Sequence, residues 1–469
     1  MQYSNTALNI LFPLILFPYT TRVLGPHGYG VIGFYESLLL LVNVLAAFGV
    51  GYYGLRLLSR SAVGDTYHAN AVLHLLLINV LISLAGTLVY FAYLVVMHVP
   101  IGSRAIMLLY GYIMLIYQLH ADWYFQSQEK FGFLLARTFV LRLFVLLASL
   151  MLVRKQEHLL TYICISACNY TFISISTLWF IRSLFPHWKW DRQLFNKLLA
   201  ALWPFAMVGI LGSVYLSLDT ILLARYGRIE ELGHYTVAAK MVRLSLNVFI
   251  GASIVFFVRL FRTQVDKSLQ ADSMLLTIHL STPIAALLFF LAEPVIQFVS
   301  GSSYLPAVPI LQCFALLWML VPLHDFFIIQ VLMVHHREKL LAKLYATACL
   351  LSLALNLVFI PRWFNQGAAY AIVLTDVFLL AASLYFSRRY FRIQPYMVKE
   401  WLLCLLCFPI SWGMTVLVFP VTQTPITRLL AGVIGSLLLY FILQWWVLRN
   451  AFWKKLWKGM YPAEGKQQG

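Results

Sequence analysis

The sequence predicts an all-α, polytopic membrane helix bundle, and three observations support this prediction. Of the 469 residues, 62% are hydrophobic and 11% are charged, whereas soluble domains are about 25% charged. Apolar segments of about 20 residues, long enough to cross the hydrocarbon of a bilayer, recur from one end of the chain to the other. Lysine and arginine are concentrated in alternate loops between these segments, as the positive-inside rule describes.

About fourteen segments have the length and hydropathy of a membrane span over a window of about 19 residues. They are 7–24, 30–53, 69–97, 104–127, 132–153, 158–182, 199–225, 232–258, 273–299, 306–334, 340–361, 367–387, 399–420 and 427–448. Several contain proline, which membrane helices tolerate where neighbouring groups satisfy the freed carbonyls. No stretch between the segments could fold as a separate soluble domain.

A weak internal similarity at a spacing of about 204 residues suggests a duplicated architecture, as transporters often show. Residues 27–44 resemble residues 232–249, with Asn43 in step with Asn247 and Glu36 in step with Lys240. The similarity relates spans 1–2 to spans 7–8 and therefore predicts two pseudo-repeated six-helix lobes plus two C-terminal helices. The expected boundaries are 1–190 for the N-lobe, 191–390 for the C-lobe and 391–469 for the last two helices and the tail.

The formal net charge of +17 could indicate a nucleic-acid partner, but its distribution argues against this. Most cations lie in the even-numbered loops and in the C-terminal tail, which predicts that both termini are cytoplasmic. The tail sequence RNAFWKKLWKGMY alternates cations with aromatic residues, a pattern typical of a helix lying at the surface of an anionic membrane. The opening MQYSNTA has no basic residue, so we expect an uncleaved first helix rather than a signal peptide.

The sequence offers no signature of nucleotide or metal chemistry. It contains neither a G-x-x-x-x-G-K-[ST] loop nor an H-E-x-x-H helix, so ATP hydrolysis and zinc catalysis within the chain are not expected. Cys404 and Cys407 form a C-x-x-C inside an apolar segment, where packing is the favoured interpretation and metal ligation the alternative. We therefore expect no metal site and no cofactor.

Lys240, Arg243 and Asn247 form one polar stripe on the eighth span because they follow one another at helical spacing. Two like charges do not neutralise each other, and each is costly within a bilayer. Two interpretations stay open: the stripe binds an anion, or each cation pairs with a carboxylate on another helix. The candidate carboxylates are Glu36, Asp219, Asp325 and Asp376.

Other ionisable residues lie in the first, fourth and fifth spans. Arg22, near the outer end of the first span, either extends to the interface or pairs with Glu36. Arg137 and Arg142 lie about 140° apart on a helix, so both cannot face Asp122. We expect one of them to pair with Asp122 and the other to line a cavity.

Four histidines lie in or near spans, where a proton relay and a packing role are both possible and packing is favoured. They are His74, His120, His279 and His324.

Several stretches together resemble bacterial polysaccharide repeat-unit (O-antigen) flippases. They are FPYTTRVLGPHGYGVIGFYESL, FGVGYYGLRLLSR, ADWYFQSQEKFGFLLART and SLDTILLARYG followed by LGHYTVAAKMVRLSL. These flippases form the polysaccharide transporter branch of the multidrug, oligosaccharidyl-lipid and polysaccharide exporter superfamily. The resemblance extends to about residue 390, and its most specific parts are R-V-L-G-P-x-G-Y-G and D-W-Y-F-Q.

The resemblance implies an inner-membrane carrier, not an enzyme. Similar flippases move undecaprenyl-diphosphate-linked oligosaccharide from the cytoplasmic to the periplasmic leaflet by alternating access, and a cationic central cavity holds the diphosphate. By position, that role passes to Arg22, Arg56, Lys240 and Arg243. The full set of candidate substrate-binding residues adds Arg137, Arg142 and Asn247.

The remaining expectations concern coupling and partners. Glu36, Asp122, Asp219 and Asp325 are candidates for ion pairing or for coupling to H⁺ or Na⁺. Expected partners are membrane lipids, a polysaccharide polymerase and a chain-length regulator, with no nucleic acid. The alternatives are a drug or cation exporter of the same superfamily, a membrane polymerase or glycosyltransferase, and a structural scaffold. A polymerase is disfavoured because no predicted outer loop exceeds about 15 residues.

Overall fold

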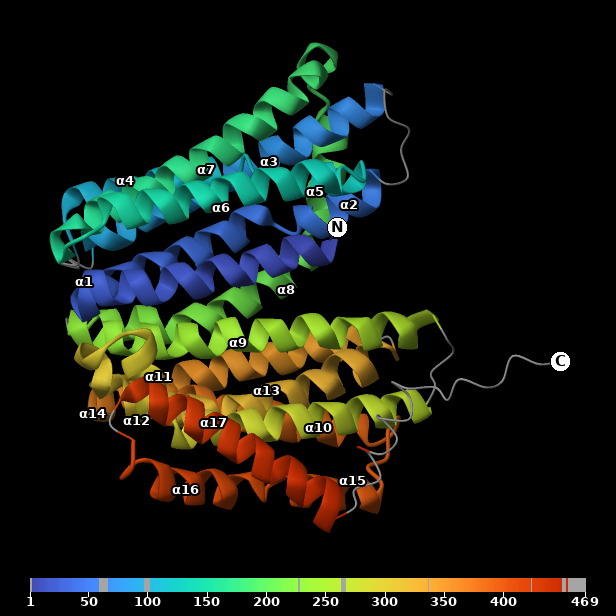
Figure 1. The fold of residues 1–469 in the computed structure, drawn as a ribbon. Helices are drawn as coiled ribbons and strands as arrows, with labels where there is room; N and C mark the ends of the chain where they lie inside the picture. The colour runs from blue at the N-terminus through green and yellow to red at the C-terminus, as the bar shows by residue number, and fades with distance from the viewer. Residues whose placement is uncertain are drawn as a thin grey trace, which may run out of the picture. The chain divides into compact units, whose positions relative to one another are not determined.

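The computed structural model describes residues 2–58, 66–96, 102–226, 228–262, 267–335, 337–422, 424–448 and 453 of the chain. This part consists of helices joined by turns and contains no strand (Figure 1). Ten helical segments within it are long and apolar enough to cross a membrane. The predicted all-α membrane bundle is therefore confirmed, and the chain is a multi-pass membrane protein.

The helices fall into two compact units, and α9 (Ile229–Arg262) and α14 (Glu338–Ser387) contribute residues to both. The first unit, Met1–Val237 with Tyr345–Ile372, contains α1 (Gln2–Ala47), α2 (Val50–Leu58), α3 (Thr66–Val96), α4 (Arg104–Tyr117), α5 (Asp122–Ser127), α6 (Phe131–Leu152), η1 (Gln156–His158), α7 (Leu159–Ile181), η2 (Arg182–His187) and α8 (Arg192–Ala224). The second, Ala238–Leu344 with Val373–Gly469, contains α10 (Lys267–Phe290), α11 (Ala292–Val299), η3 (Ser302–Ala307), α12 (Val308–Ala315), α13 (Leu317–Asp325), η4 (Phe326–Met333), α15 (Pro395–Cys404), α16 (Cys407–Val418), α17 (Pro425–Ile442) and η5 (Leu443–Val447). The lobe boundaries at 190 and 390 remain a prediction.

The helix α1 folds back on itself at Gly25. This residue has φ 68° and ψ 178°, a conformation that glycine adopts without steric cost, and Pro26 then starts the second arm. The ring centroids of Phe17 and Tyr29 lie 5.7 Å apart, whereas twelve residues of straight helix would span about 18 Å. The two arms correspond to the first and second predicted spans (Figure 1).

The helix α14 bends at Phe364, which has φ 48° and ψ −121°. A bulky residue with positive φ is strained, and surrounding groups have to hold it. The Arg228 guanidinium lies 3.5 Å from the centroid of the Phe364 ring, and the Tyr226 ring lies 5.9 Å from it. The two arms of α14 correspond to the eleventh and twelfth predicted spans.

The second arm of α1 approaches the beginning of α9 so closely that glycine is needed at the contact. A Cβ atom at Gly30 would collide with the backbone oxygen of Ile229, and one at Gly233 would collide with the backbone of Pro26. We call this contact, formed around Gly30 and Gly233, the glycine seam. It lies between the two segments whose similarity predicted an internal repeat.

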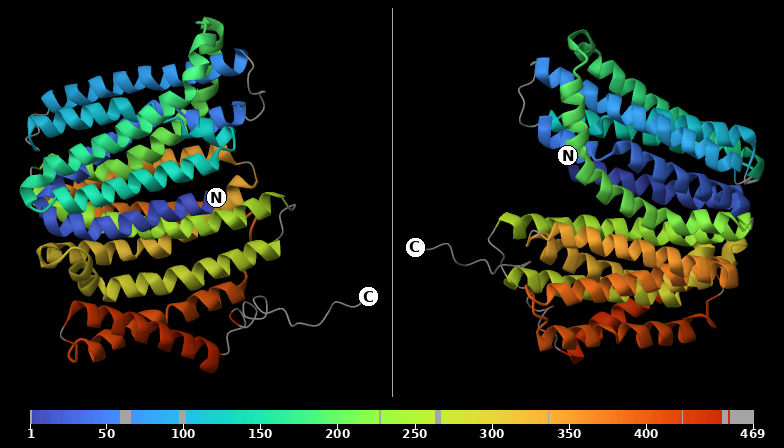
Figure 2. Two further views of the ribbon diagram at one scale, coloured as in Figure 1. Left: turned by 45° about the horizontal axis from the view of Figure 1, so that its top comes forward. Right: turned by 180° about the vertical axis from the view of Figure 1, so that it is seen from behind.

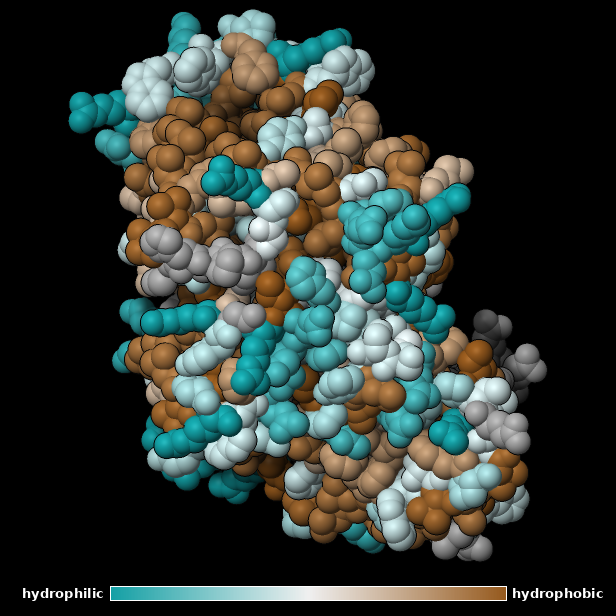
Figure 3. Space-filling view, turned by 90° about the vertical axis from the view of Figure 1, so that its left-hand side faces the viewer, coloured by the Kyte–Doolittle hydropathy of each residue, from teal (hydrophilic) through white to brown (hydrophobic). Residues whose placement is uncertain are grey.

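Each unit has a buried apolar core and an apolar exterior. In the first unit, Leu75, Trp123 and Leu198 are buried together, while Met151 on α6 and Trp179 on α7 are exposed. The helices of each unit run lengthwise beside one another (Figure 2), and hydrophilic side chains gather among apolar ones on the face formed by helix ends (Figure 3). Exposed apolar flanks of this kind suit contact with lipid rather than water.

The core of the second unit is built around α10, which packs against α12, α13, α15 and α16. Its aromatic part is formed by Phe326, Phe327 and Phe391, with centroid distances of 5.4 Å and 6.4 Å from Phe391 to the other two. Phe391 belongs to the loop that follows α14. This loop is therefore fixed to the core.

Candidate functional site

Arg137 on α6 forms an ion pair with Asp122 at the start of α5. Its Nη2 atom lies 2.5 Å from Asp122 Oδ1, and 7% of the Arg137 side chain and 50% of the Asp122 side chain are exposed. The guanidinium also donates to Thr177 Oγ1 at 3.4 Å and lies 5.6 Å from the centroid of the Phe125 ring. Of the two arginines on the fifth span, Arg137 is therefore the one that pairs with Asp122. These contacts give it a structural role.

Arg142, one and a half turns further along α6, has a different environment. Its side chain is half-buried and acts electrostatically on the Tyr170 hydroxyl of α7. The half-buried Glu36 acts on both Tyr170 and Tyr110. The first unit therefore brings Arg142 and Glu36 to one group of tyrosine hydroxyls.

Arg22 is exposed and lies on α1 one turn before the Gly25 bend. This position suits a side chain that extends to the interface or into a cavity. Its pairing with Glu36 remains a prediction. The side chains of Arg56 and Asn247, both predicted to bind substrate, lie outside the described residues.

Asp219 on α8 is buried, with 1% of the residue exposed. The Tyr235 hydroxyl of α9 donates to its Oδ2 atom. The backbone N–H and the hydroxyl of Thr220 donate to its Oδ1 atom at 2.6 Å and 3.2 Å. These donors satisfy the hydrogen-bonding capacity of the buried carboxylate. The buried Asp219 therefore joins α8 to α9 in the first unit.

Lys240 and Arg243 lie on α9 within the second unit, about 60° apart around the helix. Both side chains are half-buried, while the neighbouring Val242 and Leu246 are buried. Nearby, Trp318 Nε1 of α13 donates to the Ser245 hydroxyl at 3.1 Å, which fixes this part of α9 against α13. The structure therefore places the two predicted cations together on one face of α9.

His324, near the end of α13, lies between two carboxylates. Its Nε2 atom is 3.2 Å from Asp376 Oδ1 on α14, and its Nδ1 atom is 3.4 Å from Asp325 Oδ1. The π-helix Phe326–Met333 begins two residues after His324, and π-helical turns often occur at functional sites. The structure adds two carboxylate contacts to the packing role expected for this histidine, and a proton relay remains a prediction. Asp376, in an otherwise apolar span, was the sequence signal that could have indicated its partner.

His279 on α10 has a second carboxylate partner in the same unit. Its Nε2 atom lies 3.4 Å from Glu400 Oε2 on α15, and its Nδ1 atom lies 3.3 Å from the Tyr440 hydroxyl. Packing was predicted here too, and the structure adds a carboxylate neighbour. In the described part of the chain, no group of three or more His, Cys, Asp or Glu residues could hold a metal ion.

Comparison with known proteins identifies the family. A family model described as "Polysaccharide biosynthesis protein" matches residues 4–264, which is more than half of the chain. The chain belongs to this family. This match agrees with the resemblance to polysaccharide transport proteins that the sequence shows.

Curated relatives with similar sequences carry the name "Putative O-antigen transporter". One, from Shigella dysenteriae, is 20% identical over 397 residues, covering 79% of this chain and 94% of the relative. Another, from Escherichia coli strain K12, is 22% identical over 397 residues, covering 81% of this chain and 93% of the relative. The alignments therefore span nearly the full length of both relatives.

Solved structures show that this member of the polysaccharide biosynthesis protein family shares a transporter fold. The lipid II flippase MurJ, in an inward closed conformation, superposes with a TM-score of 0.69 at 16% identity and covers 94% of this chain and 100% of its own. An inward-facing multidrug resistance MATE family transporter has a TM-score of 0.63 at 10% identity, covering 85% of this chain and 98% of its own. At these identities the likeness establishes the fold alone.

Replacing Arg137 by alanine should lower the free energy of unfolding by about 2–3 kcal/mol, because Asp122 would lose its partner at a half-buried site. The measurement is the thermal midpoint of the detergent-solubilised protein. Asp122→Ala should have a similar effect, and the double variant should cost less than the sum of the two. Arg154→Ala, at an exposed arginine, is the matched control. Additive losses would contradict the coupling of Arg137 with Asp122.

Proposed function

We propose that this protein translocates an undecaprenyl-diphosphate-linked oligosaccharide from the cytoplasmic to the periplasmic leaflet of the bacterial inner membrane by alternating access. The observation that carries the proposal is the pair of half-buried cations, Lys240 and Arg243, on one face of α9. The names of the curated relatives support an O-antigen cargo. The fold shared with a lipid II flippase supports a lipid-linked one.

The chemistry of the cargo requires such cations. A diphosphate that entered hydrocarbon unaccompanied would lose its hydration at a large free-energy cost. Arg243 offers a forked set of donors and Lys240 a point charge to the phosphate oxygens. Arg22, Arg56, Arg142 and Asn247 complete the proposed cationic cavity. An inside-negative potential favours outward movement of the anion by about 2.3 kcal/mol per charge per 100 mV.

The wider arrangement follows the predicted duplication. The two six-helix lobes, 1–190 and 191–390, alternate access to the cavity between the leaflets. The chain transports and does not synthesise, and a polysaccharide polymerase and a chain-length regulator use the delivered cargo. A drug exporter of the same superfamily would favour an acidic cavity, which the cations on α9 argue against.

The charge bias of the loops supports a topology in which both termini are cytoplasmic. We expect an alkaline phosphatase fused to the C-terminus to be inactive, because this enzyme folds only outside the cytoplasm. A cytoplasmically folding reporter at the same site should be active. The reverse result would overturn the proposed orientation.

We further propose that proton movement drives the cycle through His324 and Asp376. A histidine between two carboxylates can take up and release a proton within hydrocarbon at a lower free-energy cost than an isolated histidine. The reason is that the carboxylates compensate the charge of the imidazolium. The adjacent π-helix and the position of Asp376 on α14 connect this group to two elements of the second unit.

Replacing both Lys240 and Arg243 by alanine should reduce surface polysaccharide by about tenfold or more, because each charge-assisted hydrogen bond to phosphate contributes about 1.5–3 kcal/mol. The variant is expressed in a strain that lacks its own flippase, and surface polysaccharide is quantified relative to protein level. Arg182→Ala with Lys189→Ala, which removes two exposed cations, is the matched control. Full surface display by the Lys240/Arg243 variant at normal protein level would refute the cationic cavity. Failure of the null strain to accumulate complete lipid-linked repeat units would argue for synthesis instead of transport.

Replacing Asp376 by asparagine should abolish the dependence of transport on a pH gradient, because His324 would lose one of its two counter-charges. Transport of fluorescent lipid-linked cargo is measured in proteoliposomes with and without an imposed gradient. Glu400→Gln, which removes the carboxylate beside His279, is the control and should retain the dependence. Transport that depends on a sodium gradient and not on pH would refute the proposed coupling to protons.

A further inference from the structure

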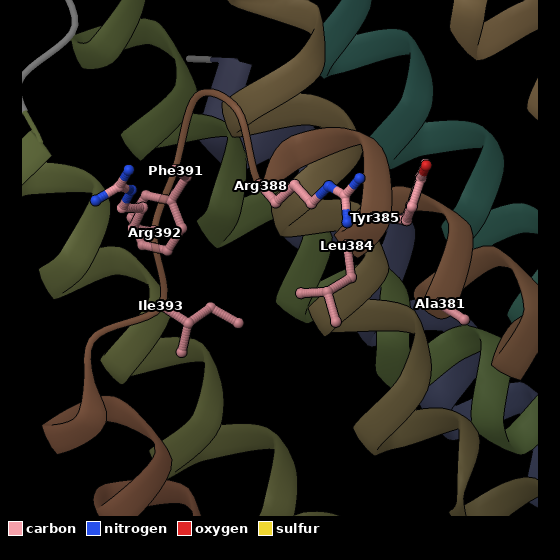
Figure 4. A pocket seen from close by; sticks show the side chains of 7 residues that line it. All are labelled: Ala381, Leu384, Tyr385, Arg388, Phe391, Arg392 and Ile393. Atoms are coloured by element: carbon pink, nitrogen blue, oxygen red, sulfur yellow. The ribbon is translucent and has the colours of Figure 1, made fainter.

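A pocket lies where α14 ends and the loop to α15 begins. It has a volume of about 600 Å³ and is lined by Ala381, Leu384, Tyr385, Arg388, Phe391, Arg392 and Ile393 (Figure 4). Figure 4 shows Leu384, on the helix, and Ile393, on the loop, extending toward the space between them. Arg388 and Arg392 stand on opposite sides of this space.

Two smaller hollows adjoin the pocket, one on its basic side and the other on its apolar side. One, of about 360 Å³, shares Phe391 and Arg392 with it and adds Arg389. The other, of about 180 Å³, shares Leu384 and Ile393 with it, and is lined only by apolar side chains and Trp401. Together they form a continuous surface that is basic at one end and apolar at the other. We call this surface the basic crevice.

The loop that carries the arginines is fixed in place. The backbone N–H groups of Tyr390 and Phe391 donate to the Ser387 carbonyl oxygen at 2.9 Å. Arg337 Nε donates to the Tyr390 hydroxyl at 2.7 Å, and Phe391 is buried in the core of the second unit. The basic end is therefore preorganised, which reduces the entropic cost of binding.

The cations of the basic crevice are not neutralised by the protein. Arg388, Arg389 and Arg392 are exposed. In the part of the chain that the structure describes, none of them is within ion-pair distance of a carboxylate. The residues that line the three hollows include no aspartate or glutamate. The three cations give this end of the crevice a positive potential that attracts an anionic headgroup.

The position of the crevice indicates the kind of anion. Ser387 is the last residue of a membrane helix, and the tyrosines Tyr385, Tyr390 and Tyr396 mark the level of the lipid headgroups. At this level a phospholipid places its phosphate next to the beginning of its acyl chains. We propose that the basic crevice binds one anionic phospholipid, with its phosphate at the arginines and an acyl chain between Leu384 and Ile393. The alternative is that these arginines serve only to orient the chain in the membrane. That role would not require an apolar crevice beside them.

Native mass spectrometry of the full-length protein in mild detergent tests this proposal. Phosphatidylglycerol should bind about tenfold more tightly than phosphatidylcholine, because the cations of the crevice attract a headgroup with a net negative charge. The Arg388→Gln/Arg389→Gln/Arg392→Gln variant should reduce phosphatidylglycerol binding to the level of phosphatidylcholine. Leu384→Trp, which fills the apolar part at an exposed position, should also weaken it. Arg182→Gln/Lys189→Gln/Arg192→Gln, which removes three exposed cations in the first unit, is the matched control and should bind as the unaltered protein does.

Thermal midpoints close to that of the unaltered protein establish that the variants are folded. Equal binding of the two phospholipids, or unchanged binding by the triple arginine variant, would overturn the proposal. Displacement of phosphatidylglycerol by a polyprenyl phosphate at lower concentration would also overturn it, because the crevice would then belong to the transported lipid. Because the crevice binds phospholipid independently of transport, loss of surface polysaccharide in the Lys240/Arg243 variant has no bearing on this result.

Discussion

An ionised group within hydrocarbon has to find an opposite charge, a set of hydrogen-bond donors or water, and the interior of this molecule is organised by that requirement. Arg137 meets it with the carboxylate of Asp122 and with two aromatic rings. The buried Asp219 meets it with donors from neighbouring residues. Because these contacts join separate helices, satisfying the charge also fixes the tertiary structure.

The same requirement separates structural charges from those suited to an anionic cargo. Arg137 is almost fully buried within its ion pair, whereas Lys240 and Arg243 are only half-buried on a helix whose adjacent residues are core. Two like charges one turn apart repel each other, and a bound diphosphate would lower this repulsion.

Much of the fold could be predicted from the sequence because hydropathy and segment length report directly on membrane helices. The bends at Gly25 and Phe364 each separate two predicted spans, although only Gly25 belongs to a residue type that predicts a bend. Helical geometry predicts that only one of Arg137 and Arg142 faces Asp122, but it does not decide which one. The position of His324 between Asp325 and Asp376 could not be predicted, because it depends on how α13 packs against α14.

The glycine seam has a consequence for the energy of separating α1 from α9. In a bilayer the lipid tails are as apolar as leucine, so contacts between helices depend on close packing rather than on the hydrophobic effect. The seam provides this packing by bringing backbone against backbone around Gly30 and Gly233. Any larger side chain at either position would hold the two helices apart and remove these contacts.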